Sequence, residues 1–337
     1  MIEQIEVTDG SRVYIGGAEA LLQQLLPQKR VVVISDSNID RTHHDLIASY
    51  EHILIGQGEQ AKSLATLDGV YRQLIEMGAD RECFILGIGG GIVTDIAGFV
   101  GATYMRGVEF GFVTTTLLGS VDASVGGKNG VNIGGYKNMV GTFLQPKFVV
   151  CDTSLLATLP KREFRAGLAE VIKSAILGEK ELFEILEQSS FDELRNNTAL
   201  LEDVVARCIK IKASVVAKDE REGGYRRILN LGHTIAHAIE KSCSKYNHGE
   251  AVAIGLYHIT RSALAQNIIS EGDANRIFSL LEHFEYDTAL PVERKILLKA
   301  IGGDKKRSGN ALHLIFPTAI GSVVDRLVPY TELDSIL

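Results

Sequence analysis

The strongest constraint on the fold is a series of short apolar runs that alternate with helical patterns over the first 150 residues. The runs are rich in β-branched and aromatic residues and lie at residues 29–39, 51–59, 82–91, 108–116 and 147–154. Amphipathic segments such as AKSLATLDGVYRQLIEMGA lie between them. Strands that are apolar almost throughout, and that alternate with helices, are typical of a mostly parallel sheet. The sequence therefore predicts an α/β domain over residues 1–154.

The pattern changes after about residue 154. Segments with helical periodicity then dominate, among them FRAGLAEVIKSAIL, TALLEDVVARCIKIKASVVAK, NLGHTIAHAIEKS and GEAVAIGLYHITRSALAQ. Near the end of the chain, ALHLIFPTAIG has the pattern of a late strand or hairpin. We therefore predict a second, mainly helical domain over residues 155–337, packed closely against the first around a shared cleft.

The composition excludes several classes of partner. The net charge of -7 provides no general basic field for nucleic acid. The most apolar stretch, residues 84–102, is interrupted by Asp95 and by glycines, which makes it a poor membrane span. The N-terminus lacks a secretory signal pattern, and the four cysteines are scattered without a CxxC motif. We expect a cytoplasmic protein that binds neither nucleic acid nor membrane.

The segment GIGGGIVTD, residues 87–95, follows an apolar run and begins a helical pattern. Free backbone N–H groups at such a helix start favour a phosphate, and glycines allow its close approach. The segment is not a true GxGxxG motif, because Thr94 stands at the third glycine position. A simple tight turn remains the alternative. Polar residues also follow the earlier strands, as ligand-binding residues do at the carboxyl ends of parallel strands.

A glycine-rich polar stretch covers residues 114–141 and contains Asp122, Lys128 and Lys137. We expect it to be a long loop, because this polar, glycine-rich stretch is too long for a turn and too structured in pattern for a linker. Lysines and an aspartate in such a loop indicate an anion-binding site. The alternative is a solvated surface loop.

Three histidines within sixteen residues, His233, His237 and His248, suggest a metal site. Zinc prefers His and Asp/Glu ligands, and catalytic sites keep three protein ligands and one open position. The HExxH motif of one class of metalloproteases is absent, because Thr234 replaces its glutamate. The spacing does not decide whether His237 binds metal or is a core residue. Nor does it choose among the glutamates that could complete the site, which include Glu170, Glu240 and Glu250.

Basic residues recur at otherwise apolar positions of the helical half. Each could simply extend its charged end into solvent. Together they could form a cationic pocket for a small anionic substrate; they are Lys173, Lys210, Lys212, Arg226 and Arg227.

Taken together, these motifs resemble the 3-dehydroquinate synthase family of sugar-phosphate cyclases. The resemblance covers nearly the whole chain and follows the family's order. Its motifs are GGGIVTDIAGFVGATYMRGV, TTTLLGSVDASVGGK, KNMVGTFLQP, LATLP, GLAEVIK, KDEREGGYRRILNLGHTIAHAIE, HGEAVAIG and GDKKRSG. The resemblance implies a Rossmann-like domain that binds NAD, a helical domain that binds one divalent metal, zinc or cobalt, and an active site between them.

The resemblance also implies roles for individual residues. The metal ligands would be Glu170, His233 and His248. The NAD contacts would be Asp36, Asn38, Glu59, Lys62, Gly90, Gly91, Asp95, Thr115, Thr116, Lys128, Lys137 and Thr158. The substrate contacts would be Asp122, Lys128, Asn138, Lys173, Lys212, Glu222, Arg226, Asn230, His237 and one of Lys305 and Lys306. Arg106 would reach the active site of a neighbouring subunit, which implies a homodimer.

The implied reaction converts 3-deoxy-D-arabino-heptulosonate 7-phosphate to 3-dehydroquinate and phosphate. It combines transient oxidation by NAD, phosphate elimination, re-reduction and intramolecular aldol closure. Departures from the family pattern are small and comprise Thr94, Asn129 and the short spacing between His233 and His248. The alternatives are a related cyclase acting on another phosphorylated sugar, a metal- and NAD-dependent polyol dehydrogenase, and a non-catalytic NAD- or metal-binding regulator.

Overall fold

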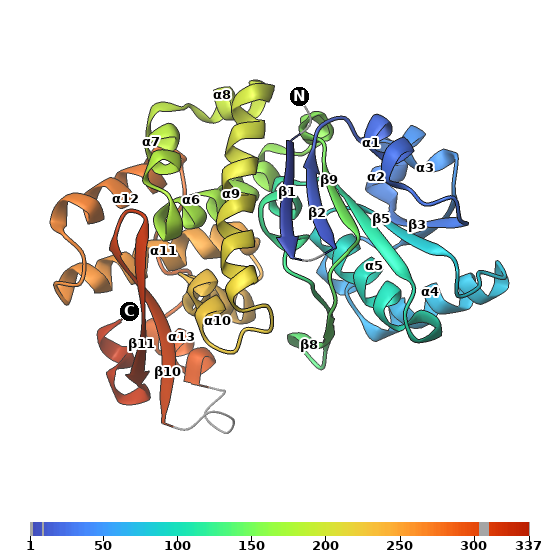
Figure 1. Ribbon diagram of the computed structural model, residues 1–337. Helices are drawn as coiled ribbons and strands as arrows, with labels where there is room; N and C mark the ends of the chain where they lie inside the picture. Colours follow the sequence, from blue (N-terminus) through green and yellow to red (C-terminus); the bar gives the residue numbers. More distant parts are fainter. Residues whose placement is uncertain (1–2, 9, 303–309, 337) are drawn as a thin grey trace. The chain divides into compact units, whose positions relative to one another are not determined.

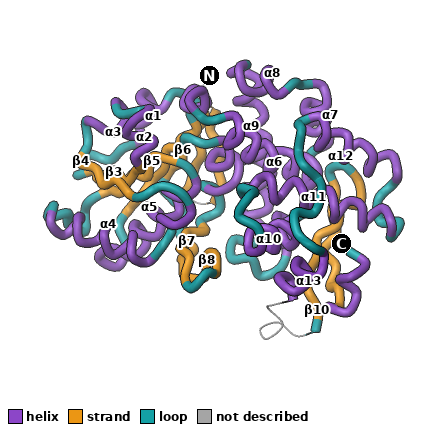
Figure 2. The backbone as a smooth tube through the Cα atoms, turned by 180° about the vertical axis from the view of Figure 1, so that it is seen from behind, coloured by secondary structure: helices purple, strands orange, loops and turns teal. Residues whose placement is uncertain are grey.

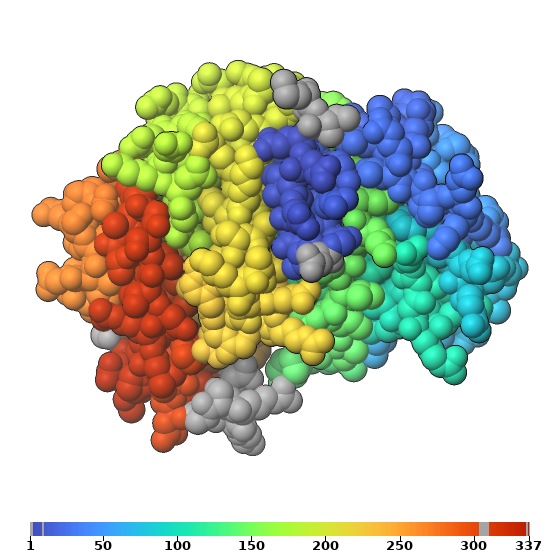
Figure 3. Space-filling model, viewed as in Figure 1, coloured from blue at the N-terminus to red at the C-terminus, as the bar shows by residue number. Residues whose placement is uncertain are grey.

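The computed structural model describes residues 3–8, 10–302 and 310–336. The chain divides into two compact units. The first comprises Met1–Phe164 and Arg195–Arg221, and the second comprises Arg165–Leu194 and Glu222–Leu337. This division differs from a single boundary after residue 154, because helix α9 (Thr198–Lys218) packs against strands β1 and β2 of the first unit. Figure 3 shows the surfaces of α9 and these strands side by side.

The first unit is built on a seven-stranded sheet with the order β1-β2-β9-β6-β5-β3-β4 (Figure 1). The strands β1 and β2 pair antiparallel, whereas all other neighbours in this sheet are parallel. The predicted mostly parallel α/β sheet is therefore confirmed. The strands are β1 (Glu3–Thr8), β2 (Ser11–Ile15), β3 (Val31–Asp36), β4 (Glu51–Ile55), β5 (Phe84–Gly89), β6 (Glu109–Thr114) and β9 (Phe148–Cys151).

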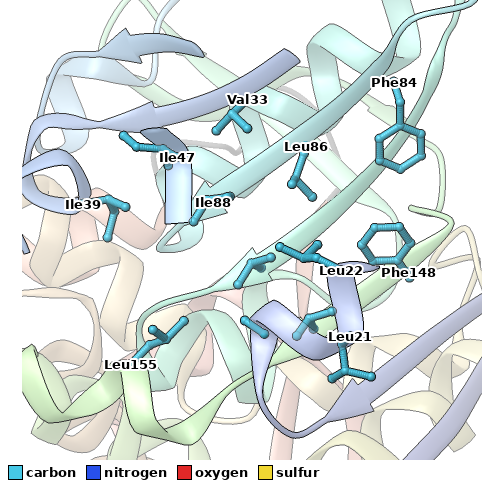
Figure 4. Close-up of a cluster of buried hydrophobic side chains, with 13 residues drawn as sticks. Leu21, Leu22, Val33, Ile39, Ile47, Phe84, Leu86, Ile88, Phe148 and Leu155 are labelled. Carbon is cyan, nitrogen blue, oxygen red and sulfur yellow. The ribbon is translucent and has the colours of Figure 1, made fainter. Parts of the chain in front are cut away.

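Apolar side chains from several strands form one buried cluster with helix α1. Figure 4 shows Leu21 and Leu22 of α1 near Phe148, whose ring stacks on Phe84 with centroids 5.6 Å apart. Burial of such large apolar side chains is the main favourable contribution to folding. The helices of this part are α1 (Ala18–Leu25), α2 (Ser37–Thr42), α3 (Asp45–Ala48), α4 (Leu64–Glu76) and α5 (Gly91–Thr103).

The glycine-rich stretch after β6 is not the long loop that we predicted. It forms a short π-helical turn, η3 (Gly119–Ala123), and a hairpin of β7 (Lys128–Ile133) and β8 (Tyr136–Phe143), seen in Figure 2. Gly134 and Gly135 have φ values of 58° and 81°, which allows a two-residue hairpin turn between Ile133 and Tyr136. The first two strands, β1 and β2, were also not predicted.

The second unit is mainly helical, as predicted. Its late strand pattern forms a hairpin of β10 (Ala311–Ala319) and β11 (Ser322–Pro329). Within the described residues, no helix combines the length and the apolar character needed to cross a bilayer. The helices from Lys161 onward, other than α9, are α6 (Lys161–Gly178), α7 (Lys180–Gln188), α8 (Phe191–Asn196), α10 (His233–Ser242), α11 (His248–Ala265), α12 (Glu271–His283) and α13 (Arg294–Gly302).

Candidate functional site

Three side chains of the second unit form a group that could hold a metal ion. Glu170 lies inside α6, while His233 and His248 are the first residues of α10 and α11. One ligand atom of each lies within 4.8 Å of the others. The Nε2 atoms of His233 and His248 lie 3.5 and 3.1 Å from Oε1 of Glu170. Two histidines and one glutamate are a donor set typical of a catalytic zinc site, which keeps a fourth position open.

In both His233 and His248, the other ring nitrogen, Nδ1, also has a hydrogen-bonding partner. Nδ1 of His233 lies 3.1 Å from the carbonyl oxygen of Leu231, which can only accept a hydrogen bond. Nδ1 of this ring therefore carries the proton and Nε2 carries the lone pair. Nδ1 of His248 lies 3.2 Å from Oε1 of Glu240. Such partners fix the ring orientation of metal-ligating histidines, so the surroundings of this group fit a metal ion.

The charges of the group are mutually dependent. Burial alone would raise the pKa of Glu170, but Lys173 and the two histidines hold it well below its usual value. The Lys173 ammonium lies 2.5 Å from Oε2 of this carboxylate. Burial lowers the pKa of His233 to about 3. For His248, burial also lowers the pKa, but the carboxylates of Glu170 and Glu240 outweigh it and raise the pKa to about 10. A positive charge is therefore favoured where His248 meets Glu170, which a divalent cation would supply.

Two glycines of α11 allow the three segments to approach this closely. A Cβ atom at Gly249 would lie 2.0 Å from the carbonyl oxygen of Ala166 in α6. A Cβ atom at Gly255 would lie 2.1 Å from the carbonyl oxygen of Gly232, the residue before His233. Gly232 itself has a φ of 76°, a left-handed conformation that favours glycine. Backbone contacts of α11 thus position both Glu170 and His233.

The spacing of residues in the sequence did not decide which of Glu240, Glu250 and His237 belong to the metal group, but their contacts in the structure distinguish them. Glu250 belongs to a capping box of α11, in which its carboxylate accepts from the Asn247 amide at 2.9 Å. Glu240 contacts His248 rather than joining the group of three. His237 is exposed, and its ring packs edge-on against His233 with centroids 5.4 Å apart. The structure therefore places His237 beside the group and not in it.

Other predicted substrate contacts of the second unit lie on the segment before α10. Arg226 is buried in the short helix η5 (Tyr225–Asn230), and Asn230 ends the same helix. The amide of Asn230 donates to Oε1 of Glu222 at 3.1 Å, which joins two predicted contacts. Lys305 and Lys306 lie outside the described residues.

In the first unit, the predicted NAD contacts lie at the carboxyl ends of four adjacent parallel strands. Asp36 ends β3, Glu59 follows β4, Gly90 follows β5 and Thr115 follows β6. The chain leaves β3 toward β4 and then returns to β5 on the other side of β3. This reversal is the topological switch point, where ligands bind in open α/β sheets.

The turn after β5 brings backbone groups close together at the start of α5. Gly90 is the N-cap residue of this helix, and a Cβ atom there would lie 2.8 Å from Cγ2 of Thr116. Thr94, the departure from the glycine motif, is buried and donates its hydroxyl to the carbonyl of Gly91 at 3.1 Å. The helix start is thus preserved despite the threonine.

The remaining predicted NAD contacts of this unit are largely interconnected. Lys62 is buried and pairs with Asp95 of α5. Burial raises the pKa of Asp95, although Lys62 opposes this. Lys137 of β8 lies 3.8 Å from Oε1 of Glu59. Two more predicted contacts have partners outside this network. The Asp36 carboxylate caps α2 by accepting from the Asn38 and Ile39 amides, and Thr158 contacts the imidazole of His43 at 2.7 Å.

Of the predicted substrate contacts in the first unit, Asp122 and Lys212 contact each other. The Lys212 ammonium of α9 donates to the carboxylate and to the carbonyl oxygen of Asp122, both at 2.6 Å. Lys128 and Asn138 lie on the hairpin and are exposed. Asn138 has a φ of 54°. Arg106 is the exposed last residue of the short helix η2 (Tyr104–Arg106), and its φ is 73°.

Three groups beside these sites were not predicted as site residues. They are the Leu231 carbonyl at His233, the His43 imidazole at Thr158, and Asn132, which contacts Glu59. The only sequence signal for Asn132 was its place in the polar stretch 114–141. The other two contacts depend on how the chain folds back and had no local signal.

A parallel-sheet unit joined to a mainly helical unit is a two-unit fold that several solved enzyme structures share. Solved structures of alcohol and glycerol dehydrogenases share the fold at 14–18% identity. A 2-deoxy-scyllo-inosose synthase complexed with carbaglucose-6-phosphate, NAD+ and Co2+ is more similar. Its TM-score is 0.88 at 25% identity, over 100% of this chain and 99% of that chain. The 2-epi-5-epi-valiolone synthase from Streptomyces hygroscopicus, with NAD+ and Zn2+ bound, has a TM-score of 0.87 at 25% identity, over 100% and 97%.

Sequence comparison narrows this class to one family. Residues 52–166 match the family model described as 3-dehydroquinate synthase N-terminal, and residues 167–307 match 3-dehydroquinate synthase C-terminal. A 3-dehydroquinate synthase from Shewanella sp. is 38% identical over 100% of this chain and 99% of its own length. Another from Pelobacter propionicus is 46% identical over 81% of this chain and 77% of its own length. The chain belongs to the 3-dehydroquinate synthase family.

Proposed function

We propose that the protein is a 3-dehydroquinate synthase, a carbon–oxygen lyase that uses NAD and one divalent metal ion, zinc or cobalt. It would convert 3-deoxy-D-arabino-heptulosonate 7-phosphate to 3-dehydroquinate and inorganic phosphate. The observation that carries the proposal is the match of full-length 3-dehydroquinate synthases to the whole chain. The closely grouped Glu170, His233 and His248 give it a chemical basis.

Each implied group has residues suited to hold it. Glu170, His233 and His248 would bind the metal, with Glu240 orienting His248. The carboxyl ends of β3, β4, β5 and β6 would bind NAD, its pyrophosphate resting at the start of α5. When bound, the metal would act as a Lewis acid toward a substrate hydroxyl, and NAD would accept a hydride and later return it.

Buried basic side chains would hold the two anionic groups of the substrate. Lys173, Lys212 and Arg226 are each at most 8% exposed; Lys173 pairs with Glu170 and Lys212 with Asp122, and the anionic groups of a bound substrate would join these pairs. Lysine and arginine in a dry environment bind phosphate and carboxylate strongly. By orienting one substrate through the whole sequence, these residues would make each step effectively unimolecular. Because NAD would return the hydride that it accepts, the reaction would have no net oxidation.

The rival functions share the fold. A polyol dehydrogenase would need no phosphate-binding lysines, and the dehydrogenase structures are similar in fold alone. A cyclase acting on another sugar phosphate is closer, because the 2-deoxy-scyllo-inosose synthase structure covers the whole chain. Its 25% identity is nevertheless well below the 38% of the full-length 3-dehydroquinate synthase. A non-catalytic regulator would not need the buried basic residues.

The test is phosphate release from 3-deoxy-D-arabino-heptulosonate 7-phosphate with NAD and zinc, while absorbance is followed for NADH. The proposal expects stoichiometric phosphate and 3-dehydroquinate without accumulation of NADH. Glucose 6-phosphate and glycerol serve as competing substrates. Phosphate from glucose 6-phosphate alone would indicate another cyclase, and NADH accumulating with glycerol would indicate a dehydrogenase.

We also propose a cytoplasmic homodimer in which Arg106 contributes to the active site of the partner. Two observations support it. Arg106 lies exposed in an unusual bend where Met105, Arg106 and Gly107 all have positive φ values, and such backbone strain clusters at functional sites. All four cysteines are free, which suits a reducing compartment.

A further inference from the structure

Asn132 lies in β7, at a point where several predicted ligand contacts meet. It is half-buried, and both ends of its side-chain amide are used. The Nδ2 group donates to Oε1 of Glu59 at 2.7 Å. The Oδ1 atom accepts from the backbone amide of Asn138 at 2.9 Å. One side chain thus joins a predicted NAD contact to a predicted substrate contact.

The backbone of Asn132 makes a third connection. Its amide donates to the carbonyl of Lys62 at 2.9 Å, and Asn132 forms a parallel bridge with Ser63. Lys62 in turn pairs with Asp95 of α5. The hairpin is therefore attached to the segment that follows β4 and, through Lys62, to the helix that begins at the glycine turn.

These bonds constrain groups that would otherwise be mobile. Glu59 and Asn138 are both exposed, and exposed side chains and loops sample several conformations. Asn138 also has a φ of 54°, which few residues other than glycine adopt. The bond from its amide to Asn132 stabilises that conformation. Lys137 lies 3.8 Å from the same oxygen of Glu59 that Asn132 contacts.

We propose that Asn132 is a positioning residue. Its hydrogen bonds hold the cofactor contacts Glu59 and Lys62 and the substrate contact Asn138 in fixed positions relative to one another. It touches neither ligand itself in this scheme. Its Nδ2 end orients Glu59 toward NAD, and its Oδ1 end fixes the backbone of Asn138 for the substrate. The inference rests on the proposed function, which supplies the two ligands.

The two ends of the amide can be tested separately. Asn132→Asp replaces the donor toward Glu59 with a second carboxylate but keeps an acceptor for Asn138. Asn132→Ala removes both ends. Asn275→Asp, at an exposed position of α12, is the matched control for the same chemical change. The readouts are the Kd of NAD by calorimetry, since the chain has no tryptophan, together with kcat, substrate KM and melting temperature.

We expect Asn132→Asp to raise the Kd of NAD about tenfold or more, the effect of losing a hydrogen bond to a charged group. Its substrate KM at saturating NAD should stay within about twofold of wild type. Asn132→Ala should raise both constants, while Asn275→Asp should change neither. In the double variant Glu59→Gln/Asn132→Asp, the new amide can donate to the new carboxylate. NAD binding should therefore be weakened less than the two single effects predict.

An unchanged Kd of NAD in Asn132→Asp would overturn the inference. So would an equal rise of substrate KM in the Asp and Ala variants, because that indicates general disruption of the hairpin. If Asn132→Asp does not fold, Asn132→Ala decides: a Kd of NAD and a substrate KM both within about twofold of wild type reject the link. Absence of phosphate release by wild type would reject the proposed function instead, and the calorimetric comparison with NAD would still decide the role of Asn132.

Discussion

His248 is the residue whose removal most directly tests the metal group. We expect His248→Ala to lose metal affinity by more than the roughly 10- to 100-fold typical of changing a partner that only orients a ligand. Glu240→Gln should fall within that smaller range, because Glu240 contacts the ring nitrogen of His248 that faces away from Glu170. Metal content after dialysis measures both effects.

The control for these variants is His283→Ala, a histidine of α12 that contacts the Ser189 carbonyl. It should retain metal as wild type does. Metal content in His248→Ala equal to that of His283→Ala would remove His248 from the ligand set.

Lys173 contributes to stability because its ammonium pairs with the buried carboxylate of Glu170. In the proposed function it also binds the substrate. Removing one partner of a buried ion pair costs about 3–5 kcal/mol, since the other charge stays buried. We expect Lys173→Met to destabilise the metal-free protein by about that amount, and to retain metal when loaded but lose turnover. Urea unfolding and phosphate release measure the two effects. Lys180→Met, on the exposed side of α7, should change neither; near-normal turnover in Lys173→Met would exclude it from the site.

The two histidine pKa values predict how the metal-free protein responds to pH. The folded pKa of His248 is raised to about 10, so its contribution is complete below pH 6.5 and is lost as the pH rises toward 10. The folded pKa of His233 is lowered to about 3, so its contribution is present above pH 6.5 and is lost as the pH falls toward 3. The metal-free protein should therefore gain most from these two residues near pH 6.5.

Urea unfolding at about pH 5, 6.5 and 9 measures this dependence. With saturating zinc, the alkaline loss attributed to His248 should disappear, because metal binding needs the deprotonated ring. A metal-free His248→Ala variant that lost as much stability as wild type above pH 6.5 would contradict the assignment.

At the scale of elements, the close contact between α11 and α6 depends on Gly249. A methyl group there would lie 2.0 Å from the Ala166 carbonyl, so the helices must separate. We expect Gly249→Ala to destabilise the protein by about 1–3 kcal/mol and to weaken metal binding, because Glu170 and His248 move apart. Urea unfolding and metal titration measure both.

Gly272→Ala is the matched control within a helix. Its added Cβ would meet only Ser270 Oγ, at 3.9 Å, so the variant should be slightly more stable, by about 0.5–1 kcal/mol. Equal destabilisation by the two substitutions would show that the contact with α6 is unimportant.

Periodicity predicted those elements whose side chains carry a regular pattern. The runs that became β3, β4, β5, β6 and β9 are apolar almost throughout, so the parallel sheet could be predicted. The hairpin β7–β8 could not, because Lys128, Asn129 and Asn132 make its first strand polar and Gly130 interrupts it. Its best signal was the Gly134–Gly135 pair, which we did not interpret as a turn. Resemblance supplied Glu170 as a ligand, since spacing alone could not distinguish it from Glu240 and Glu250.

At the scale of the whole molecule, the proposed dimer predicts complementation between two inactive variants. Arg106→Ala would lack the residue donated to the partner, and His248→Ala would lack a metal ligand. In a mixed dimer, one site would combine an intact metal group with an intact Arg106 from the other subunit. An equal mixture of subunits should recover about a quarter of wild-type turnover, since half of the dimers are mixed and each has one complete site.

The mixture is prepared by denaturing the two variants together and refolding them, with each variant refolded alone as the control. Sedimentation velocity gives the assembly state. No recovery in a mixture that forms dimers would mean that Arg106 acts within its own chain.

The order of the metal group along the chain has a consequence for synthesis on the ribosome. Glu170 precedes His248 by 78 residues, and the segment Arg195–Arg221 between them belongs to the other compact unit. At about 5–20 residues per second, Glu170 is made several seconds before its partner. During that interval the carboxylate has no complete site to enter. Because His248 is the last of the three ligands to be made, Glu170, His233 and His248 cannot bind a metal ion together until the segment that carries α9 has already been synthesised.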